Sequence, residues 1–499
     1  MEHAVEPCGT SPADEDAAMS ESRGGGGDAS KTMFGVVVLC VAGIAMSLTQ
    51  TLIVPLIPML PVMLGTTASN ASWAVTVTMA VGAVATPIAG RVADMVGKRR
   101  VLLFCVGGVA VGSLVCAVAP GLTVFLVGRA LQGLGVAFVA VGISIMRDFV
   151  PAHRLGTAVG MMSSSLAVGG ALGLPFSAFV AQTFGWRELF WISVAGSVAC
   201  FVGIVALIKV IGNRTGGRFD LFGAIGLSVI LLTLLLPLSK GPEWGWTSSL
   251  TLSMFGLSAA TFVVWVNYER RKRNPLLDLR IATLRAVMLG NVIGLMNAFA
   301  FYGMELVPIQ MLMAPASTEN GLGVSMLSAG LLMAPTGLAA FVSSNVGARL
   351  GRSLGVRVTL VIASLIAIVG LCALLVALLV GWAFPIVFLV VITCLIGTST
   401  GMSYATLPTL IMEATPVEQT GEANGLNALM RIVGLAAAAA VTGMILANNV
   451  TEVAGGDMTA PSTAGFTWAV VVSLGAVVVS VVAALCLPRS ARTAEPRHA

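Results

Sequence analysis

The chain has 499 residues, of which 57% are hydrophobic, 10% are charged and 6% are aromatic. Soluble globular proteins carry about 45–50% apolar and about 25% charged residues, so this composition excludes a soluble enzyme and predicts a chain that lies mostly in lipid. The formal net charge of +5 does not indicate a nucleic-acid partner, because the 27 Lys and Arg residues lie mostly in short clusters between apolar runs, as topology signals do.

Residues that could carry catalysis or bind a metal are sparse. The three histidines (His3, His153 and His498) lie outside the apolar segments, so neither a histidine metal site nor a catalytic triad is expected. Seven of the eight cysteines lie inside apolar runs without CxxC spacing, which predicts buried thiols. The chain carries no GxxxxGK[ST] segment and therefore no P-loop. We expect no metal, no cofactor and no enzyme activity.

The first 32 residues combine several acids with a run of four glycines. Such a composition cannot support a core, so we expect a disordered acidic tail over residues 1–32. The tail lacks a basic region followed by a short apolar region and a cleavage site, and the first apolar run is therefore expected to be a retained span rather than a signal peptide.

Fourteen apolar runs follow, each long enough to cross a bilayer as a helix. They form a set of six, a pair and a second set of six, which predicts an all-α polytopic membrane protein: two six-helix bundles related as a pseudo-repeat, plus two extra linker helices. In chain order the spans cover residues 34–59, 72–90, 101–119, 122–146, 158–182, 187–211, 221–238, 250–268, 286–313, 324–347, 358–381, 383–408, 422–447 and 464–487.

The distribution of basic residues predicts the orientation. Alternate connections hold 23 of the 27 Lys and Arg, the other connections hold only Arg187 and Lys240, and Arg129 and Arg431 lie within spans. Because basic residues in short loops stay cytoplasmic, both termini are predicted to be cytoplasmic. The expected domains are the acidic cytoplasmic tail, a six-helix bundle over residues 33–211, a two-helix linker over 212–285, a six-helix bundle over 286–487 and a cytoplasmic tail over 488–499.

A weak internal repeat relates the two sets of six spans. Residues 90–99 (GRVADMVGKR) and residues 348–357 (ARLGRSLGVR) each stand between the second and third span of their set. Arg, an apolar residue, a small residue, a later apolar residue, Gly and a final Arg recur in register. Chance similarity between two basic loops would explain one or two of these matches, whereas the shared register indicates a transporter built from two halves.

The loop from Gly90 to Arg100 combines a helix-ending glycine, an acid and a basic cluster. Asp94 can bond the positive N-terminal end of a neighbouring helix or a nearby Arg, while an ordinary positive-inside loop would not explain this acid or the two glycines. The segment resembles the signature loop of the major facilitator superfamily. That resemblance implies a cytoplasmic latch between the halves, formed by Gly90, Arg91, Asp94, Gly97, Lys98 and Arg99.

In the fourth span, Arg129, Gln132 and Gly133 lie three and four residues apart and share one helical face. A lone Arg within a span is costly unless it faces a cavity or a partner, so we expect a functional role, with snorkelling as the alternative. The pattern resembles the second motif of the superfamily, whose arginine is implicated in proton movement.

The fifth span carries Gly160, Gly169 and Gly173, followed by Pro175. This spacing resembles the third motif of the superfamily, which is characteristic of antiporters. Leu174 departs from that motif, in which Gly is followed directly by Pro. Close packing of small residues between helices is the alternative explanation.

Fourteen spans, together with residues 306–310 (LVPIQ) and 421–427 (GEANGLN), resemble the fourteen-helix drug:proton antiporter branch of the superfamily. The resemblance covers residues 34–487. It implies export of amphipathic, drug-like small molecules in exchange for protons by alternating access, with a proton gradient as the energy source. The expected partners are the substrate, protons and the lipid bilayer, the expected state is a monomer, and the expected location is the bacterial inner membrane.

This branch commonly carries an acid in its first span, but residues 48–51 (LTQT) have none. Glu305 is the acid expected well inside an apolar run, on a stripe with Asn297 and Phe301. Burial favours its protonated form and a cationic substrate its ionised form, which is the competition that an antiporter needs. We therefore expect proton coupling at Glu305 together with Arg129, the alternative being a structural buried Glu. The expected substrate cavity is lined by Thr49, Gln50, Gln132, Asn297, Phe301, Gln310, Asn427 and Arg431.

Two other functions stay open at this point. The 6% aromatic content is modest for a drug-binding cavity, which keeps open a proton-coupled transporter of a defined polar metabolite. A transport-inactive membrane sensor is the third candidate, although the sequence holds no soluble signalling domain or catalytic cluster.

Overall fold

The computed structural model describes residues 12–53, 56, 60–66, 68–208, 219–272, 275–382, 385–416, 419–452 and 459–488. Within these ranges 13 helices are long and apolar enough to cross a membrane, and the two parts of one bent helix add a fourteenth span. The predicted all-α polytopic fold class is confirmed. In chain order the spans form a set of six, a pair and a second set of six.

The first set of six spans, which we call the first half, begins at α1 and ends at α8. The end of the first span was expected at residue 59, but α1 ends at Thr51, and Pro55 and Pro58 follow in the sequence, where proline cannot continue a helix. α1 is helical from Pro12, and disorder of the tail over residues 1–32 stays a prediction. The bounds are α1 Pro12–Thr51, α2 Leu60–Met63, α3 Ala68–Val96, α4 Lys98–Ala117, α5 Leu122–Gln132, α6 Ala137–Phe149, α7 Ala152–Thr183 and α8 Trp186–Leu207.

The linker consists of α9 (Leu221–Trp244), α10 (Ser249–Arg271) and the short α11 (Leu279–Ala282). The sequence places Lys240 in a loop after residue 238, and this is wrong because α9 continues for six more residues. Lys240 is buried there, 3.1 Å from Glu243 and 4.9 Å from the ring centroid of Trp73. An acid of α9 and the aromatic face of Trp73 in α3 stabilise the cation where α9 packs on α3.

The second set of six spans, which we call the second half, begins at α12. A two-stranded antiparallel hairpin connects its last two helices and pairs Val450 with Pro461. The bounds are α12 Arg285–Met313, α13 Met326–Ser353, α14 Val356–Val380, α15 Ile386–Ala414, α16 Thr420–Asn448, β1 Val450–Glu452, β2 Thr459–Pro461 and α17 Thr463–Leu485.

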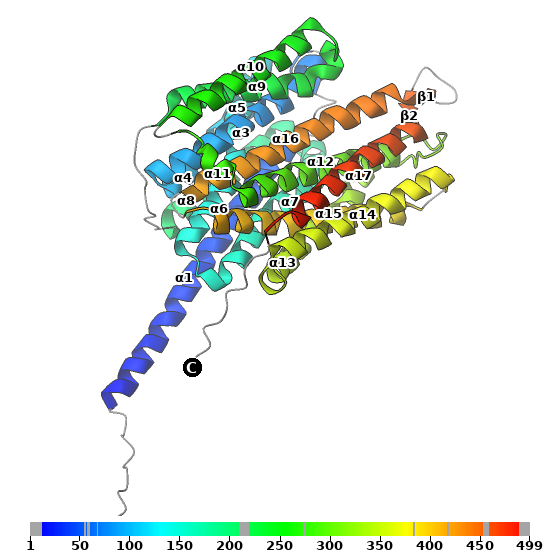
Figure 1. Ribbon diagram of the computed structural model, residues 1–499. Helices are drawn as coiled ribbons and strands as arrows, with labels where there is room; N and C mark the ends of the chain where they lie inside the picture. The colour runs from blue at the N-terminus through cyan, green and yellow to red at the C-terminus, as the bar shows by residue number, and fades with distance from the viewer. Residues whose placement is uncertain are drawn as a thin grey trace, which may run out of the picture.

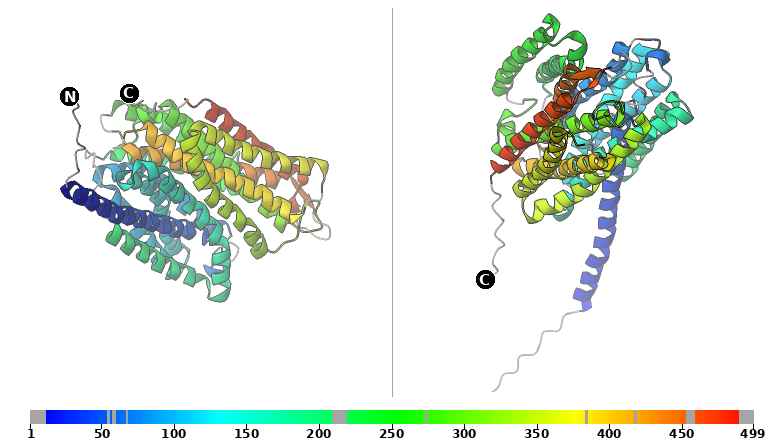
Figure 2. Two further views of the ribbon diagram at one scale, coloured as in Figure 1. Left: turned by 90° about the horizontal axis from the view of Figure 1, so that it is seen from below. Right: turned by 90° about the vertical axis from the view of Figure 1, so that its right-hand side faces the viewer.

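The two halves pack most extensively through two pairs of helices, α13 with α7 and α16 with α3. These pairs exchange corresponding helices of the two sets, as a pseudo-twofold repeat requires. The linker helix α9 packs on both α3 and α16, so the linker lies along one edge of the molecule (Figure 1, Figure 2). We call the end that carries the repeated segments 90–99 and 348–357 the basic end, and the end with the β1–β2 hairpin the opposite end.

The repeat is visible in the backbone. Gly97 and Gly355 both adopt positive φ angles, 114° and 90°, directly before α4 and α14 begin. Glycine is needed there because a side chain would be strained in this region. The expected loop from Gly90 to Arg100 is wrong in extent, since α3 continues to Val96 and a single glycine makes the turn.

The fourth span is not one continuous α-helix, contrary to the expectation for residues 122–146. A 3-10 turn at Gly133–Val136 separates α5 from α6. A Cβ on Gly133 would lie 2.7 Å from the carbonyl oxygen of Thr78, so the close approach of α3 requires glycine here. Ten consecutive residues of α6, Ala137 to Met146, are buried.

Candidate functional site

Asp94 joins the two halves at the basic end. Its side chain is 1% exposed, and its carboxylate accepts hydrogen bonds from the backbone N–H groups of Gly421, at 3.2 Å, and Glu422, at 2.9 Å. These donors belong to the first turn of α16 in the second half, whose N–H groups have no partner within the helix. A carboxylate at this position is stabilised by the positive end of the helix.

Glu422 extends this contact to the linker. Its Oε2 accepts a hydrogen bond from Arg91 Nη1 at 3.2 Å, and both side chains are largely buried. Its Oε1 accepts a hydrogen bond from the backbone N–H of Asp278 in the loop between α10 and α11. One carboxylate of the second half therefore binds both the first half and the linker.

Small residues allow the backbones to approach closely at the same place. A Cβ on Gly90 would collide with the carbonyl oxygen of Gly421, and a Cβ on Gly425 would lie 3.1 Å from the carbonyl oxygen of Thr86. Gly90 is thus required by the distance between α3 and α16 and not by its φ angle.

The remaining residues of the expected latch contact their own half. Lys98 Nζ donates to Asp148 Oδ1 at 2.7 Å, and Arg99 Nη2 donates to the carbonyl oxygen of Val205 at 2.8 Å. Both partners belong to the first half, so these two cations fix α4 to its neighbours. Of the predicted set, Gly90, Arg91 and Asp94 reach the second half.

Two further arginines cross between the halves at the basic end. Arg147 Nη1, at the end of α6, donates to Thr420 Oγ1 at 2.7 Å and to the carbonyl oxygen of Thr415 at 3.3 Å. Arg352 Nη2, at the end of α13, donates to Thr157 Oγ1 at 3.1 Å in an exposed position. Each of these hydrogen bonds and ion pairs between the two halves lies at this end.

Arg129 is 1% exposed and organises a polar network within the first half. Its Nε donates to the carbonyl oxygen of Ala74, and its Nη1 donates to the carbonyl oxygen of Thr49 and, at 2.6 Å, to Gln132 Oε1. No Asp or Glu among the described residues pairs with this guanidinium. Carbonyl and amide oxygens therefore replace a counter-ion.

The network extends to two more helices through hydroxyl groups. Gln132 Nε2 donates to Ser113 Oγ at 2.8 Å, and Ser193 Oγ lies 2.9 Å from Ser113 Oγ and 3.1 Å from Thr49 Oγ1. Thr49 and Gln132, two of the residues assigned to the substrate cavity, thus make their hydrogen bonds inside the packed first half. Gln50 is half-buried.

The glycines of α7 lie at helix contacts. A Cβ on Gly173 would collide with Thr51 Oγ1 of α1, one on Gly169 would lie 2.7 Å from the carbonyl oxygen of Ile44, and one on Gly160 would lie 3.3 Å from Ala348 Cβ of the second half. Pro175 lies within α7, which bends by 41° between Gly170 and Pro175. The motif therefore packs α7 on α1 near one end and on the second half near the other.

In the second half, polar residues of α12, α15 and α16 come together. Asn427 Nδ2 donates to Asn291 Oδ1 at 3.2 Å. The guanidinium carbon of Arg431 lies 4.6 Å from the ring centroid of Tyr404, and no described carboxylate pairs with this arginine. The Nδ2 of Asn297 is buried and has no hydrogen-bond partner among the described residues. Arg431, which the sequence analysis assigns to the substrate cavity, thus makes a cation–π contact with Tyr404.

Glu305 lies two helical turns beyond Asn297, about 12 Å further along α12, towards the opposite end. It has no hydrogen bond or ion pair within the described ranges, and it is exposed although it lies inside a span. Phe301 and Gln310, on the same helix, are half-buried.

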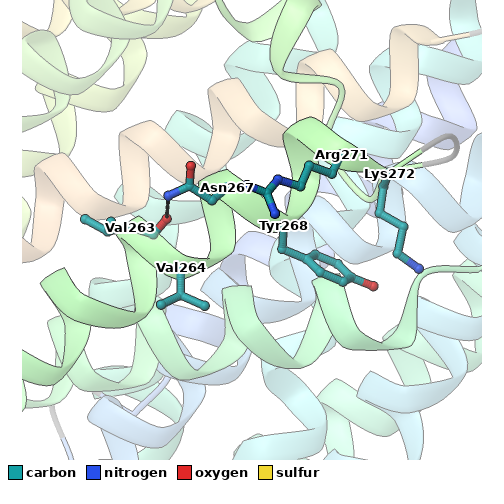
Figure 3. A pocket seen from close by; sticks show the side chains of 6 residues that line it. All are labelled: Val263, Val264, Asn267, Tyr268, Arg271 and Lys272. Carbon is teal, nitrogen blue, oxygen red and sulfur yellow. Dashed lines mark hydrogen bonds between the residues drawn. The ribbon is translucent and has the colours of Figure 1, made fainter.

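A shallow pocket lies on the linker, away from these residues. It is lined by Val263, Val264, Asn267, Tyr268, Arg271 and Lys272, all on the last turns of α10 or directly after it (Figure 3). Asn267 Nδ2 uses one donor within the helix, to the carbonyl oxygen of Val263 at 2.8 Å. None of the residues predicted for the substrate cavity lines this pocket.

Two residues of the interface were missed by the sequence analysis. Glu422 stands in the segment 421–427 that carries the resemblance to the antiporter branch, and that segment was the available signal. Arg147 enters the sequence analysis only as one of the 23 Lys and Arg in the alternate connections. Neither partner is predictable from spacing, because Arg91 and Glu422 are 331 residues apart.

The model of the Major Facilitator Superfamily matches residues 39–439 of the chain. The multidrug resistance protein Stp of Mycobacterium tuberculosis is 30% identical over 72% of this chain and 65% of its own length, so the chain spans less than two-thirds of that relative. The tetracenomycin C resistance and export protein of Streptomyces glaucescens is 27% identical over 73% of this chain and 66% of its own length.

Two solved structures share the fold. The human organic anion transporter MFSD10 superposes with a TM-score of 0.65 at 16% identity and covers 90% of this chain and 99% of its own. The proton:xylose symporter XylE superposes with a TM-score of 0.60 at 14% identity and covers 92% of this chain and 95% of its own.

Proposed function

The chain belongs to the major facilitator superfamily, and from that premise we propose that this transporter exports amphipathic small molecules in exchange for protons by alternating access. We propose that it acts as a monomer in a bacterial inner membrane. The names of the Mycobacterium and Streptomyces relatives, which refer to multidrug resistance and to export, support this direction of transport.

We place the basic end in the cytoplasm. Arg91, Lys98, Arg99, Arg147 and Arg352 all lie there, and short basic connections stay on the cytoplasmic side. The two halves would rock about the α3–α16 and α7–α13 contacts. In one state the basic end is closed and the opposite end is open, and in the other state the reverse holds.

One observation carries the proton coupling. Glu305 is an isolated carboxylic acid within a span, exposed and without a hydrogen bond or ion pair among the described residues. A group in this position can take up a proton when the site is empty and release it when a cation arrives. An acid tied into an ion pair, such as Glu422, has no such freedom.

The test is transport in proteoliposomes with Glu305→Gln, which keeps the shape and fixes the charge at zero. Export of a cationic drug driven by a pH gradient should be lost, while counterflow without a gradient should persist. Glu188→Gln, at the start of α8, is the matched control and should transport as the wild type does. Full pH-driven export by Glu305→Gln would exclude this carboxyl group as the proton carrier.

A polar or anionic substrate is the second candidate, because the second half holds unused donors. Arg431 has no described acidic partner, and Asn297 Nδ2 has no described acceptor. A carboxylate or hydroxyl of a defined metabolite would satisfy both groups. If Arg431→Gln abolishes binding of organic anions and leaves binding of cations unchanged, the metabolite function is favoured.

A further inference from the structure

Two buried carboxylates face each other at the basic end of the linker. Asp220 is the N-cap of α9 and is 7% exposed, and Glu269 lies in the last turn of α10 and is 2% exposed. Neither belongs to the contacts between the two halves or to the polar residues near Glu305. Burial of two like charges side by side is costly, so their arrangement requires an explanation.

Each carboxylate uses one oxygen. Asp220 Oδ1 accepts from the backbone N–H of Gly223 at 3.0 Å and from the Tyr268 hydroxyl at 2.9 Å, and Lys272 Nζ lies 4.0 Å away. Glu269 Oε2 accepts from the backbone N–H of Leu276 at 3.0 Å. The second oxygens, Asp220 Oδ2 and Glu269 Oε1, are both buried and have no hydrogen-bond partner among the described residues.

The two unpartnered oxygens point to the same place. A Cβ built on Gly223 would collide with Glu269 Oε1 and would lie 3.0 Å from Asp220 Oδ2. The absence of a side chain on Gly223 therefore leaves both oxygens beside the same small space. A hydrogen atom between them would satisfy both at once, because a protonated carboxyl group donates and an ionised one accepts.

We propose that Asp220 and Glu269 bind one shared proton between Asp220 Oδ2 and Glu269 Oε1, and that this linker proton site controls the contact of the linker with Glu422. The proton resides on Glu269, because Asp220 already receives two hydrogen bonds and faces Lys272. No group of three or more His, Cys, Asp or Glu side chains that could hold a metal ion occurs here among the described residues.

The proton site is connected to the interface between the halves by a short loop. Leu276 N–H binds Glu269, and the N–H of Asp278, two residues later, binds Glu422. The buried side chains of Leu276 and Leu277 pack in one cluster with Leu429 and Ile432 of α16. A carboxylate thus holds the loop at each end. Loss of the shared proton would leave the charges of Asp220 and Glu269 repelling each other at the Leu276 end of the loop.

Other ionisable groups among the described residues lie near the pair. Tyr268 and Lys272 come from α10, and Figure 3 shows both side chains at its end. The contact with Tyr268 raises the pKa of Lys272, so its positive charge persists at physiological pH. At the other end of the loop are Asp278, whose N–H binds Glu422, and Arg91, which pairs with Glu422. Glu422 is therefore the competing titratable group, and the experiment must separate it from Glu269.

Hydrogen exchange measured by mass spectrometry on the full-length protein in nanodiscs reads the loop directly, because the amides of Leu276 and Asp278 are the donors. At high pH the shared proton is lost, and with it the charge-assisted hydrogen bond between Glu269 and Asp220. After correction for the intrinsic pH dependence of exchange, protection of residues 275–284 in the wild type should therefore fall by about tenfold between pH 6 and pH 9. Glu188→Gln should retain this dependence.

Glu269→Gln should remain protected at every pH, because the amide oxygen still accepts from Leu276 and the amide nitrogen donates to Asp220 Oδ2. Asp220→Asn should behave in the same way, which keeps a test available if the first variant does not fold. Protection that is independent of pH in the wild type overturns the proposal, as does a wild-type pH profile in Glu269→Gln, which would assign the titration to Glu422. Protection that depends on Na⁺ at fixed pH would replace the proton by a metal ion. None of these measurements needs a substrate, so they stand apart from the test of proton-driven export.

Discussion

The two copies of the repeated segment share a backbone but differ in what they bind. In the first copy, Asp94 is buried and accepts two hydrogen bonds from the start of α16. At the same position of the second copy stands Arg352, which is exposed and donates to Thr157. The glycine turns at Gly97 and Gly355 are alike. The repeat therefore sets where the chain turns, while single side chains set which copy stabilises the closed basic end.

Asp94→Asn should have the largest effect, because it removes the contact that distinguishes the first copy from the second. The variant keeps the shape but loses the charge that the α16 N-terminus stabilises. A loss of about 2 kcal/mol would shift the equilibrium between the closed and open basic end by about 30-fold. Turnover in proteoliposomes should fall by about tenfold or more in protein that remains monodisperse. Wild-type turnover would show that the contact does not govern the cycle.

Gly90→Ala makes the first copy resemble the second, where Ala348 occupies the matching position. The added methyl group collides with the carbonyl oxygen of Gly421, so we expect a loss of about 1–3 kcal/mol in the stability of the closed state. Gly443→Ala in α16 is the control, since a Cβ there meets nothing within 4 Å. Thermal unfolding of both variants, followed by tryptophan fluorescence, would be compared, and equal unfolding temperatures would contradict the close approach at Gly90.

Glu422→Gln tests the ion pair with Arg91 and should have a smaller effect. The amide oxygen can still accept from Asp278, whereas the charge attraction is lost. A pair that is largely but not fully buried contributes about 1 kcal/mol, so turnover should fall by about fivefold. A double-mutant cycle with Arg91→Gln measures the pair itself. Additive effects of the two substitutions would show that the ion pair contributes nothing.

Arg352→Ala should have the smallest effect and sharpens the comparison from the other side. Its hydrogen bond to Thr157 lies at the surface, where such contacts contribute about 0.5 kcal/mol or less. Turnover should stay within about twofold of the wild type. If Arg352→Ala matched Asp94→Asn in a parallel transport assay, the two copies would be equivalent after all.

Much of the fold follows from the sequence because hydropathy and charge act locally. The hydropathy of the chain shows the six-two-six order of spans without any knowledge of contacts. Residues 90–99 and 348–357 show the register of the repeat, and the first of these segments carries the family resemblance. The turns at Gly97 and Gly355 follow from the same register. Helix ends are less predictable, since α9 continues past residue 238 once Lys240 finds Glu243 and Trp73.

The candidate site is less predictable because it depends on how each helix is rotated. Spacing placed Arg129 beside Gln132, and the two side chains do bond. Spacing did not indicate that Thr49 and Ser193 complete their network, since those residues lie on other helices. The resemblance to the superfamily's signature loop assigned Lys98 and Arg99 to the interface, whereas their partners lie within the first half.

The 3-10 turn at Gly133–Val136 rotates and shifts the second part of one span relative to the first. Each 3-10 residue turns the chain by about 120° rather than about 100° and advances it by about 2.0 Å rather than 1.5 Å. Over four residues the side chains beyond the turn are rotated by about 80° and displaced by about 2 Å relative to an unbroken helix. One span can therefore serve two incompatible phases, a polar one at Arg129 and a fully buried apolar one from Ala137 onwards, and a helix wound evenly through residues 133–136 would satisfy only one of them.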